Sequence, residues 1–457
     1  MTKIKRTTAI LCSCFLCAAL AAQRKHSVIL VTIDGMRNEM VTSDHMPSPF
    51  MKQLVEERGA MFVDSVLTVA PSMTYPTHTA IITGKTPLEH GIQSNGIFTY
   101  NRAGETRYNL YADSIKQPTL WQWVKEQGGT TASIFWPVST ASKWIDYNVP
   151  EYYAAPEENW KGGAMEYIRP VCTPEGLLAE LEREATGRMT DATLRANSFE
   201  YDAKSAYMVN YLMNQYRPEL TTLHLITTDY AQHAMGTEGY KVQQTVASAD
   251  NAIGLIIENL EYMHLMDSTT IIVCGDHGFV QARWRLNPNV LLTQAGLLSQ
   301  EPGGEWQGCF STLGAASYLY LNPELSAKKQ KKALKEMRAL FENQPDSIRS
   351  LYSILDNQEI IELGGDPMAA LCIDPVAGAA CKNNRTGEWY GKATGGYHGY
   401  MNGCTPTCLL IYGAGAKDPH LLDGLLETGN VEAGNSGKKV MKQTSIATLV
   451  KRLLEKH

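Results

Sequence analysis

Three aspartates stand just beyond short apolar runs, at positions where an open α/β sheet would hold an active site. Each comes at or soon after the end of one run: Asp34 after 27–33, Asp229 after 222–226 and Asp276 after 270–274. Parallel strands end at one edge of their sheet, and ligands bind beyond that edge. A single Asp-Gly after a strand is typical of a turn, but three aspartates in this context predict a shared chemical site.

Histidines at suitable spacings would let these aspartates take part in metal binding. Asp229 and His233 are four residues apart, so a helix would put both on one face, where a carboxylate and an imidazole can share one zinc ion. A surface ion pair is the alternative for these two residues. His398, in Gly-Tyr-His-Gly, would supply a third protein ligand for the same ion. Asp276 and His277 would point to opposite faces of a regular strand, so they converge only if the flanking glycines permit a sharp turn.

Thr74 is the candidate nucleophile. It lies in Pro-Ser-Met-Thr-Tyr-Pro-Thr-His, ahead of the helix-like apolar run 79–82, and a threonine there commonly caps the helix. Pro76 fits the first turn of such a helix. A helix start presents backbone N–H groups and the positive end of the dipole to an anion, and a metal can activate a threonine hydroxyl to attack phosphorus. Both interpretations, helix cap and nucleophile, remain open from the residues alone.

The order of these motifs resembles the nucleotide pyrophosphatase/phosphodiesterase family, the type I phosphodiesterases of the alkaline phosphatase superfamily. The shared motifs are strand-Asp-Gly, Thr-aromatic-Pro-x-His, Asp-x-x-x-His, Asp-His-Gly and a late His-Gly, and they run from about residue 28 to 415. Three shorter segments also match: Thr83-Gly84, His90-Gly91-Ile92 and Phe135-Trp136-Pro137. Each piece is weak alone, whereas the full set in order is specific.

The resemblance implies two zinc ions per chain and a covalent mechanism. The first zinc would be held by Asp34, Thr74, Asp276 and His277, and the second by Asp229, His233 and His398. Asn95 matches the asparagine that binds a phosphoryl oxygen in the family, although Asn-Gly by itself predicts only a turn. Thr74 would attack phosphorus, and water would then hydrolyse the phosphothreonine intermediate.

Aromatic residues indicate where the substrate would bind. The family has a base-stacking aromatic residue after the nucleophile, where this chain has Tyr75. Trp136 with Tyr152 or Tyr153 would complete a slot for a nucleobase, with core packing as the alternative for Trp136. The expected substrate is a small nucleotide or related diester. The formal net charge of −6 argues against binding a nucleic-acid polymer, but not against a small phosphorylated substrate bound through metals.

Departures from the family leave the substrate open. Thr77 replaces its usual asparagine, Val138 replaces the glycine after Trp-Pro, and 229–233 is more similar to phosphonoacetate hydrolase, a sister with the same zinc ligands. A phosphonate hydrolase or a phosphomonoesterase is therefore the alternative enzyme, and it would need cationic groups for the additional charge. Three lysines are available for that purpose: Lys85, Lys116 and Lys143. A catalytically dead binding protein is the alternative of another class.

Alternating strand and helix patterns predict the elements that would hold this site. Apolar runs bounded by turn residues predict buried parallel strands at 27–33, 131–135, 222–226, 270–274 and 408–412. Helical patterns occupy 49–58, 201–216, 242–263 and 327–343. The expected fold is α/β, with a doubly wound, mostly parallel sheet flanked by helices, as in alkaline phosphatases. This domain would cover 24–457, with insertions near 140–170 and 285–395 that form a smaller cap.

Residues 1–21 have the pattern of an export signal. Three basic residues precede an apolar run that ends in Ala19-Leu20-Ala21, a small-x-small cleavage site. A secreted or periplasmic protein is expected, with no stable membrane span after cleavage. A retained membrane anchor and a lipoprotein are the alternatives, although the apolar run is short for a full membrane span. Seven of the ten cysteines lie beyond this segment, and an odd number leaves at least one unpaired. The candidate disulfides are Cys372 with Cys381 and Cys404 with Cys408.

Overall fold

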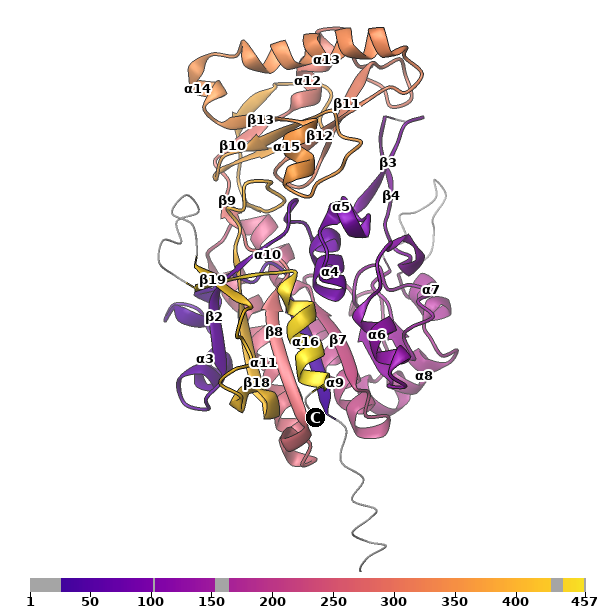
Figure 1. The fold of residues 1–457 in the computed structure, drawn as a ribbon, viewed down its shortest axis with the longest axis vertical. Helices are drawn as coiled ribbons and strands as arrows, with labels where there is room; N and C mark the ends of the chain where they lie inside the picture. Colours follow the sequence, from indigo (N-terminus) through magenta and orange to yellow (C-terminus); the bar gives the residue numbers. More distant parts are fainter. Residues whose placement is uncertain (1–25, 102, 153–163, 429–438, 456–457) are drawn as a thin grey trace, which may run out of the picture.

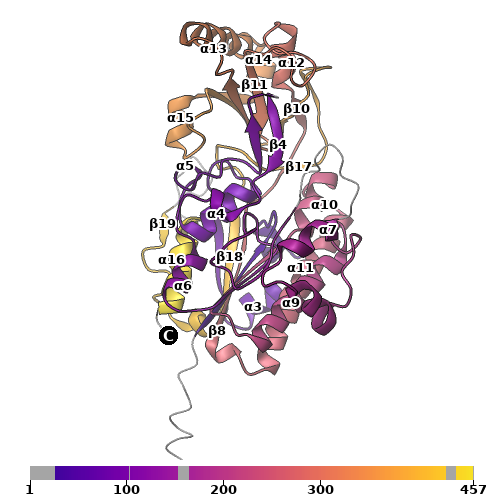
Figure 2. The same cartoon turned by 90° about the vertical axis from the view of Figure 1, so that its right-hand side faces the viewer.

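The computed structural model describes residues 26–101, 103–152, 164–428 and 439–455. Its centre is a nine-stranded mixed sheet in the order β19-β20-β2-β18-β8-β1-β7-β5-β6, with smaller sheets beside it. Helices cover both faces of the large sheet (Figures 1 and 2). The expected α/β sheet flanked by helices is thus confirmed. The predicted export signal lies outside the described residues.

The middle of the sheet is parallel. Its strands are β8 (Thr269–Gly275), β1 (Ser27–Ile33), β7 (Leu220–Leu225), β5 (Thr131–Ile134) and β6 (Tyr147–Val149). Every residue of the first four of these is buried. Because helices cover both faces, nearly continuous apolar runs are favoured over alternation, which is why these strands are visible in the sequence.

One strand direction was predicted wrongly. The run 408–412 forms β18 (Thr407–Gly413), which is antiparallel both to β8 and to β2 (Met61–Leu67). A strand buried on both faces is apolar whichever way it runs, so its pattern carries no information on direction. The edge of the sheet is completed by β20 (Lys439–Lys442) and β19 (Leu426–Thr428).

The hydrophobic core lies in two layers, one on each face of the sheet. One layer packs under α3 (Pro49–Glu56), α9 (Phe199–Gln215) and α11 (Tyr240–Tyr262). The other packs under α4 (Thr74–Thr83), α6 (Leu120–Glu126) and α16 (Ser445–Glu455). Figure 2 shows the two helix groups on opposite sides of the strands. The short α10 (Thr227–Met235) follows β7 at the upper edge of the sheet.

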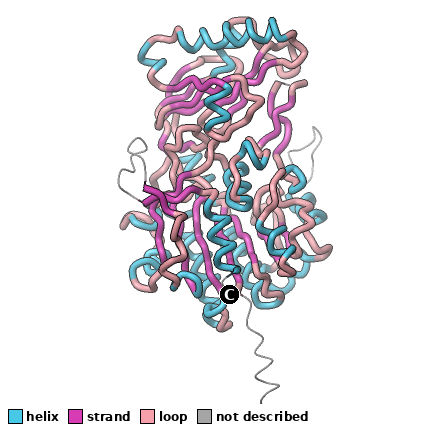
Figure 3. Tube along the Cα trace, viewed as in Figure 1, coloured by secondary structure: helices cyan, strands magenta, loops and turns pink. Residues whose placement is uncertain are grey.

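A second, smaller layer stands above that edge (Figures 1 and 3). It contains an antiparallel sheet of β11 (Gly308–Thr312), β12 (Ser317–Leu321), β14 (Leu371–Pro375) and β13 (Tyr352–Asp356). The predicted helix at 327–343 is α13 (Ala327–Glu342), and its apolar face joins the core of this layer. The hairpin of β3 (Gly96–Thr99) and β4 (Gly104–Tyr108) reaches up to the same layer, where Phe98 stacks on Tyr320 with centroids 4.2 Å apart.

Two further expectations concern the membrane and the cysteines. In the described ranges, no helix has both the length and the apolar composition needed to cross a membrane. The seven described cysteines are all free thiols, so neither candidate pair forms a disulfide.

Candidate active site

The seven residues expected to bind metal converge at the edge where the parallel strands end. They come from five places in the fold: Asp34 after β1, Asp276 and His277 after β8, Asp229 and His233 on α10, Thr74 at the start of α4, and His398 after β17 (Gly396–Tyr397). The short β17 pairs with β9 (Val280–Gln281), which continues the chain beyond β8, so His398 is brought next to His277. Residues up to 364 positions apart, from Asp34 to His398, thereby share one site.

The first cluster surrounds His277. Its Nε2 atom lies 3.3 Å from Asp34 Oδ1, 3.2 Å from Asp276 Oδ2 and 3.3 Å from Thr74 Oγ1. Asp34, Asp276 and His277 are all buried, and one potential ligand atom from each lies within 4.8 Å of the others. The arrangement matches the set of residues expected to hold the first metal.

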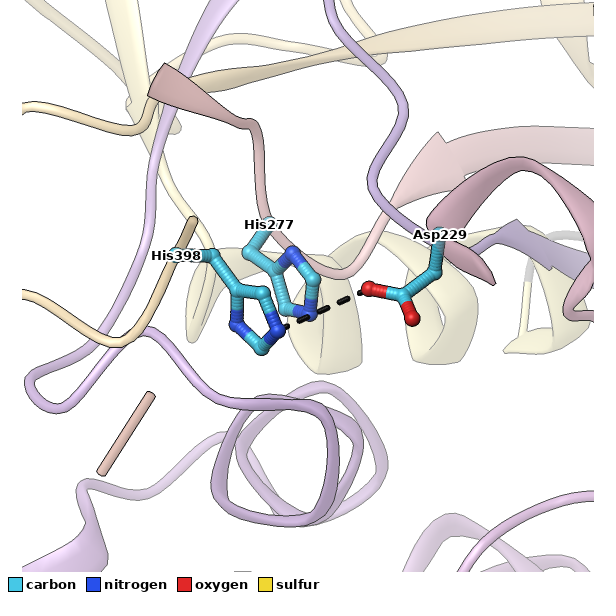
Figure 4. A group of neighbouring side chains, drawn as sticks. All are labelled: Asp229, His277 and His398. Atoms are coloured by element: carbon cyan, nitrogen blue, oxygen red, sulfur yellow. Dashed lines mark ion pairs between the residues drawn. The ribbon is translucent and has the colours of Figure 1, made fainter. Parts of the chain in front are cut away.

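The second cluster adjoins the first. Asp229 Oδ1 lies 3.4 Å from His233 Nε2 and 3.5 Å from His398 Nε2, and the two nitrogens are 3.1 Å apart. The rings of His277 and His398 stack at 3.6 Å, almost parallel. Figure 4 shows Asp229 facing the paired nitrogens of these stacked rings. The two clusters therefore form one continuous polar floor.

Close packing and two backbone hydrogen bonds fix Asp276 beside His277. A side chain on Gly275, the last residue of β8, would collide with the Thr407 hydroxyl and the Met36 backbone. Gly35 has a φ of +70°, a left-handed conformation that favours glycine, and its N–H donates to Asp276 Oδ1 at 3.0 Å. The His277 N–H donates to the same oxygen at 2.9 Å. The two bonds hold Oδ1, and Oδ2 is left to face His277 Nε2.

All three histidines present the same nitrogen to the site. Nδ1 of His277, His233 and His398 lies 3.2, 3.0 and 3.0 Å from the carbonyl oxygens of Gly278, Gly396 and Ser72, respectively. A carbonyl oxygen only accepts, so each Nδ1 carries the proton and each Nε2 has its lone pair. Metal-ligating histidines are commonly oriented in this way by a hydrogen bond at the other ring nitrogen.

The charges and unmade hydrogen bonds fit divalent cations at both clusters. Asp34 Oδ1, Asp229 Oδ1 and Asp276 Oδ2 are buried without a hydrogen-bond partner, and each faces imidazole lone pairs. Burial, with repulsion from Asp276, raises the pKa of Asp34 well above its usual value. Burial and repulsion from Asp229 raise the pKa of Asp276 to about 8. Acceptors crowded in this way need a cation between them, and mixed nitrogen and oxygen donors suit zinc.

Thr74 is the first residue of α4, whose N-cap position is Met73. Its hydroxyl therefore does not serve as the helix cap, and Oγ1 instead lies 3.3 Å from His277 Nε2. The next backbone N–H, that of Tyr75, donates to Asn95 Oδ1 at 2.9 Å. This bond brings the Asn95 amide beside Thr74, so the Asn-Gly pair is not merely a turn.

The predicted aromatic slot is not open in this structure. Tyr75 is 2% exposed and packs with Ile92, Leu110 and Val138. Trp136 is 0% exposed and joins the core under α4 and α6. Of the two tyrosines predicted beside them, Tyr152 is half-buried. Tyr153 lies outside the described residues. Exposed rings stand nearby: Tyr108, 41% exposed, lies 5.7 Å from the Tyr75 ring, and Tyr111 Oη lies 3.2 Å from Tyr152 Oη.

Three buried polar residues beside the first cluster were given no role from the sequence, although His78 closes the Thr-aromatic-Pro-x-His motif. They are His78, Glu151 and His224, each less than 5% exposed. Burial lowers the pKa of His78 to about 3 and raises that of Glu151 to about 8, the latter opposed by a hydrogen bond from Tyr75. One signal was available, since His224 interrupts an apolar run that is otherwise typical of a buried strand. Glu151 follows β6 and gave no comparable signal.

A cation beside the second cluster was also missed. Lys382 Nζ lies 4.3 Å above the Tyr397 ring, and its charge contributes to lowering the pKa of His398, after burial and His233. Two of the three lysines suggested by sequence have other partners: Lys85 pairs with Glu89 at 3.0 Å, and Lys143 lies over Trp144 at 4.8 Å.

The chain is similar to known proteins of one family. The sequence pattern of the family described as type I phosphodiesterase / nucleotide pyrophosphatase matches residues 28–399. Mouse ectonucleotide pyrophosphatase/phosphodiesterase family members 3 and 7 are 23% and 24% identical over 56% and 58% of this chain. Ectonucleotide pyrophosphatase/phosphodiesterase 2 of Saccharomyces cerevisiae is 26% identical over 56%. The matches span 25%, 54% and 48% of those three proteins, respectively.

Solved structures share the fold across most of the chain. Murine ectonucleotide pyrophosphatase/phosphodiesterase 5, as an inactive variant in complex with AMP, has a TM-score of 0.60 at 17% identity and covers 94% of this chain and 95% of its own. The human counterpart has a TM-score of 0.60 at 16% identity with the same coverage. At such identities the likeness establishes the fold alone.

Proposed function

Because the chain belongs to the type I phosphodiesterase / nucleotide pyrophosphatase family, we propose that it is a metal-dependent hydrolase of phosphodiester or phosphoanhydride bonds in small nucleotide-like substrates. The observation that carries this proposal is the Thr74 hydroxyl, 3.3 Å from His277 Nε2 at the junction of two Asp/His clusters. A nucleophile, a helix start and two cation sites are the parts that phosphoryl transfer through a covalent intermediate needs.

The proposed cofactors are two zinc ions per chain. The first would be held by Asp34, Thr74, Asp276 and His277, and the second by Asp229, His233 and His398. When bound, such ions lower the pKa of a coordinated hydroxyl and neutralise charge on attacking and leaving oxygens. The unpartnered carboxylate oxygens and the shared Nε2 orientation of the histidines support this assignment.

The chain's own residues would then carry out an in-line displacement in two steps. Thr74 Oγ1 forms a bond to phosphorus while the bond to the leaving oxygen breaks, and the hydroxyl proton is released to solvent. Water then attacks phosphorus, the Thr74–phosphorus bond breaks, and Thr74 Oγ1 takes up a proton. Because the Tyr75 N–H occupies Asn95 Oδ1, Asn95 Nδ2 is the atom that would donate to a non-bridging phosphoryl oxygen, together with the Thr74 N–H.

Charge around the site supports diesters over monoesters and phosphonates. A monoester brings one more negative charge to phosphorus, yet the proposed donors at Asn95 and the backbone are neutral. Glu151 supplies no positive charge either, because burial raises the pKa of its carboxyl to about 8. Lys382 supplies a positive charge near the site, which contributes to lowering the pKa of His398. It stands beside the second cluster, where it would meet an anionic leaving group.

A nucleobase would stack on the exposed rings rather than on the buried ones. Tyr108 shields Tyr75 at 5.7 Å, and both Tyr108 and Tyr111 are over 40% exposed. Aromatic stacking of this kind contributes roughly 1–3 kcal/mol per base.

The proposal also includes export to the periplasm or beyond, because residues 1–21 have the pattern of an export signal.

A substrate panel on the purified, zinc-loaded chain tests the proposal. We expect a nitrophenyl nucleotide diester to have a higher kcat/KM than nitrophenyl phosphate or phosphonoacetate. Thr74→Ala should reduce turnover to less than about one thousandth of the wild-type rate, and acid quenching of the wild type during turnover should trap phosphate on Thr74. A higher kcat/KM for the monoester or phosphonoacetate would establish the alternative enzyme, and an active Thr74→Ala variant would remove the nucleophile.

A further inference from the structure

The hairpin of β3 and β4 connects the active site to the smaller layer above the sheet edge (the upper layer), and this connection has no role in the mechanism above. Asn95 directly precedes β3, and Tyr108 is the last residue of β4. The tip of the hairpin, residues 100–103, lies at the other end of β3, about 13 Å away for a strand of four residues. The two strands therefore lead from the Asn95 amide to a different layer of the protein (Figure 1).

A hairpin of this size needs support from other parts of the fold. Within the described ranges, β3 and β4 pair only with each other, and an isolated two-stranded hairpin is at best marginally stable in water. The register shifts between Ile97 and Phe98, which interrupts the pairing further. Contacts made beyond the pairing must therefore hold the strands, and with them Asn95, in place.

Arg385 fastens the tip of the hairpin to the upper layer. It follows β15 (Ala379–Cys381), and its Nη2 donates to the Ala103 carbonyl oxygen at 2.6 Å. Its Nη1 donates to the carbonyl oxygens of Ser299 and Glu301, 3.2 and 3.1 Å away. The guanidinium group has a rigid, planar array of donors, which suits three carbonyl oxygens at once. One side chain thus joins the hairpin to a loop of the upper layer.

The carbonyl that Arg385 binds belongs to a buried and strained residue. Ala103 is 1% exposed and has a φ of +49°, a left-handed conformation that costs a non-glycine residue about 1–3 kcal/mol. Its carbonyl oxygen also accepts from Cys309 Sγ at 3.0 Å. Burial raises the pKa of Cys309 to about 11, so the thiol keeps its proton and remains a donor. Such a conformation persists only where neighbouring contacts enforce it.

Aromatic rings attach β3 to the same layer. Phe98 stacks on Tyr320 at 4.2 Å, and Tyr320 Oη donates to Asp366 Oδ2 at 2.8 Å. The Tyr100 ring lies 6.3 Å from that of Trp306. The hairpin is therefore fixed to the upper layer twice, by stacking along β3 and by hydrogen bonds at its tip.

At its other end, the hairpin determines the position of Asn95. The Asn109 N–H donates to the Asn95 carbonyl oxygen at 2.8 Å, and the Tyr75 N–H donates to Asn95 Oδ1 at 2.9 Å. A tilt of the hairpin would move Asn95 relative to Tyr75 and Thr74. Because a catalytic donor must stand within hydrogen-bond range of the developing charge, a displacement of about 1 Å is enough to lower the rate strongly.

We propose that Arg385 is a positioning residue for Asn95, and that it keeps Asn95 Nδ2 beside Thr74 by holding the hairpin tip to the upper layer. Arg385 acts through the hairpin and not through contact with the substrate. The inference rests on the proposed function in assigning Nδ2 to a phosphoryl oxygen. The link from Arg385 to Asn95 can be measured without turnover, so the two proposals can fail separately.

Three substitutions test this link. Arg385→Met removes the donors and keeps a long side chain. Arg349→Met is the matched control, because Arg349 is also a half-buried arginine of the upper layer, and its Nη1 donates to the Tyr352 carbonyl oxygen at 2.6 Å. Phe98→Leu removes the stack on Tyr320 but keeps an apolar side chain. It loosens the hairpin independently, and it gives the same comparison if Arg385→Met fails to fold.

The first assay is hydrogen exchange of single amides in the zinc-loaded full chain without substrate. The N–H groups of Tyr75 and Asn109 both donate to Asn95, so their exchange rates report how firmly Asn95 is held. Arg385→Met and Phe98→Leu should raise both exchange rates about tenfold or more, whereas Arg349→Met should leave them unchanged. Wild-type exchange rates at both amides in Arg385→Met would overturn the proposal.

The second assay is turnover of a nitrophenyl nucleotide diester in the wild-type and Asn95→Ala backgrounds. Arg385→Met should lower kcat about tenfold in the wild-type background with little change in KM. It should have little effect on kcat in Asn95→Ala, because the donor is already absent there. Arg349→Met should leave kcat unchanged in both backgrounds.

Equal fractional losses of kcat in the two backgrounds would show that Arg385 does not act through Asn95, and would reject the proposal. A wild type that cleaves no diester, together with faster amide exchange in Arg385→Met, would reject the proposed function and keep the link between Arg385 and Asn95. A wild type that cleaves diesters, with unchanged amide exchange in Arg385→Met, would do the reverse.

Discussion

Asn95 offers a sharp test of the proposed chemistry because its two amide atoms have different tasks. Oδ1 accepts from the Tyr75 N–H at 2.9 Å, which leaves Nδ2 as the proposed donor to a phosphoryl oxygen. Asn95→Ala removes both atoms. Asn95→Asp keeps an oxygen for the Tyr75 N–H but removes the donor. The pair of variants therefore separates the contribution of Asn95 to catalysis from its contribution to stability.

The expected magnitudes follow from these two bonds. Loss of a donor to the developing charge costs about 10²–10³ in kcat, or about 3–4 kcal/mol of transition-state stabilisation. Both variants should show this loss, and Asn95→Asp at least as strongly, because its carboxylate repels the phosphoryl oxygens. Loss of the bond to the Tyr75 N–H should lower the free energy of unfolding by about 1 kcal/mol in Asn95→Ala. Asn95→Asp should retain wild-type stability.

The assays are kcat on a nitrophenyl nucleotide diester with zinc present and unfolding in urea. Asn109→Ala is a matched control, because Asn109 Nδ2 donates to the Ser94 carbonyl at 2.8 Å and so supports the same loop without touching Thr74. It should lose stability and keep its kcat. An Asn95→Asp variant within about threefold of the wild-type kcat would refute the donor role. Equal loss of stability in both Asn95 variants would refute the structural role of Oδ1.

Three further predictions concern metals, the leaving group and the base. The metal-free protein should lose stability as pH rises from about 4 to about 8, because the pKa of Asp276 is about 8 in the folded state against 3.8 in the unfolded state, which therefore loses its proton first. Bound zinc should abolish this pH dependence of the free energy of unfolding, measured in urea, and an unchanged pH dependence would contradict the cation sites. Lys382→Gln should lower kcat/KM about tenfold for a nucleoside triphosphate, whose leaving group is anionic, but much less for a nitrophenyl diester. Equal losses of kcat/KM on both substrates would exclude a contact between Lys382 and the leaving group. Tyr108→Ala should lower kcat/KM about 10-fold or more on a nucleotide diester and little on bis(nitrophenyl) phosphate. Equal kcat/KM values for wild type and variant on the nucleotide diester would show that the nucleobase does not stack on Tyr108.

The sequence was most informative where burial is complete and motifs are local. The strand at 27–33 was predicted at its observed bounds, because a strand covered on both faces is uniformly apolar. The spacing of Asp229 and His233 indicated that a helix would put both on one face, and the structure places them on α10. The family could be recognised because the motifs occur in a specific order along the chain, and order is a property of sequence alone.

The tertiary structure decided which side chains share an environment. Tyr75 and Trp136 resemble substrate contacts in sequence, but packing from Val138, Leu110 and α6 encloses them. Glu151 and His224 carried weak signals or none, because their partners are distant in the chain: His224 lies beside both Asp34 and Glu151 only in the folded protein. The direction of β18 likewise depended on its neighbours and not on its own apolar pattern. Local sequence determines the periodicity and chemistry of each segment, whereas burial, charge and proton position depend on contacts between distant segments, which only the folded chain brings together.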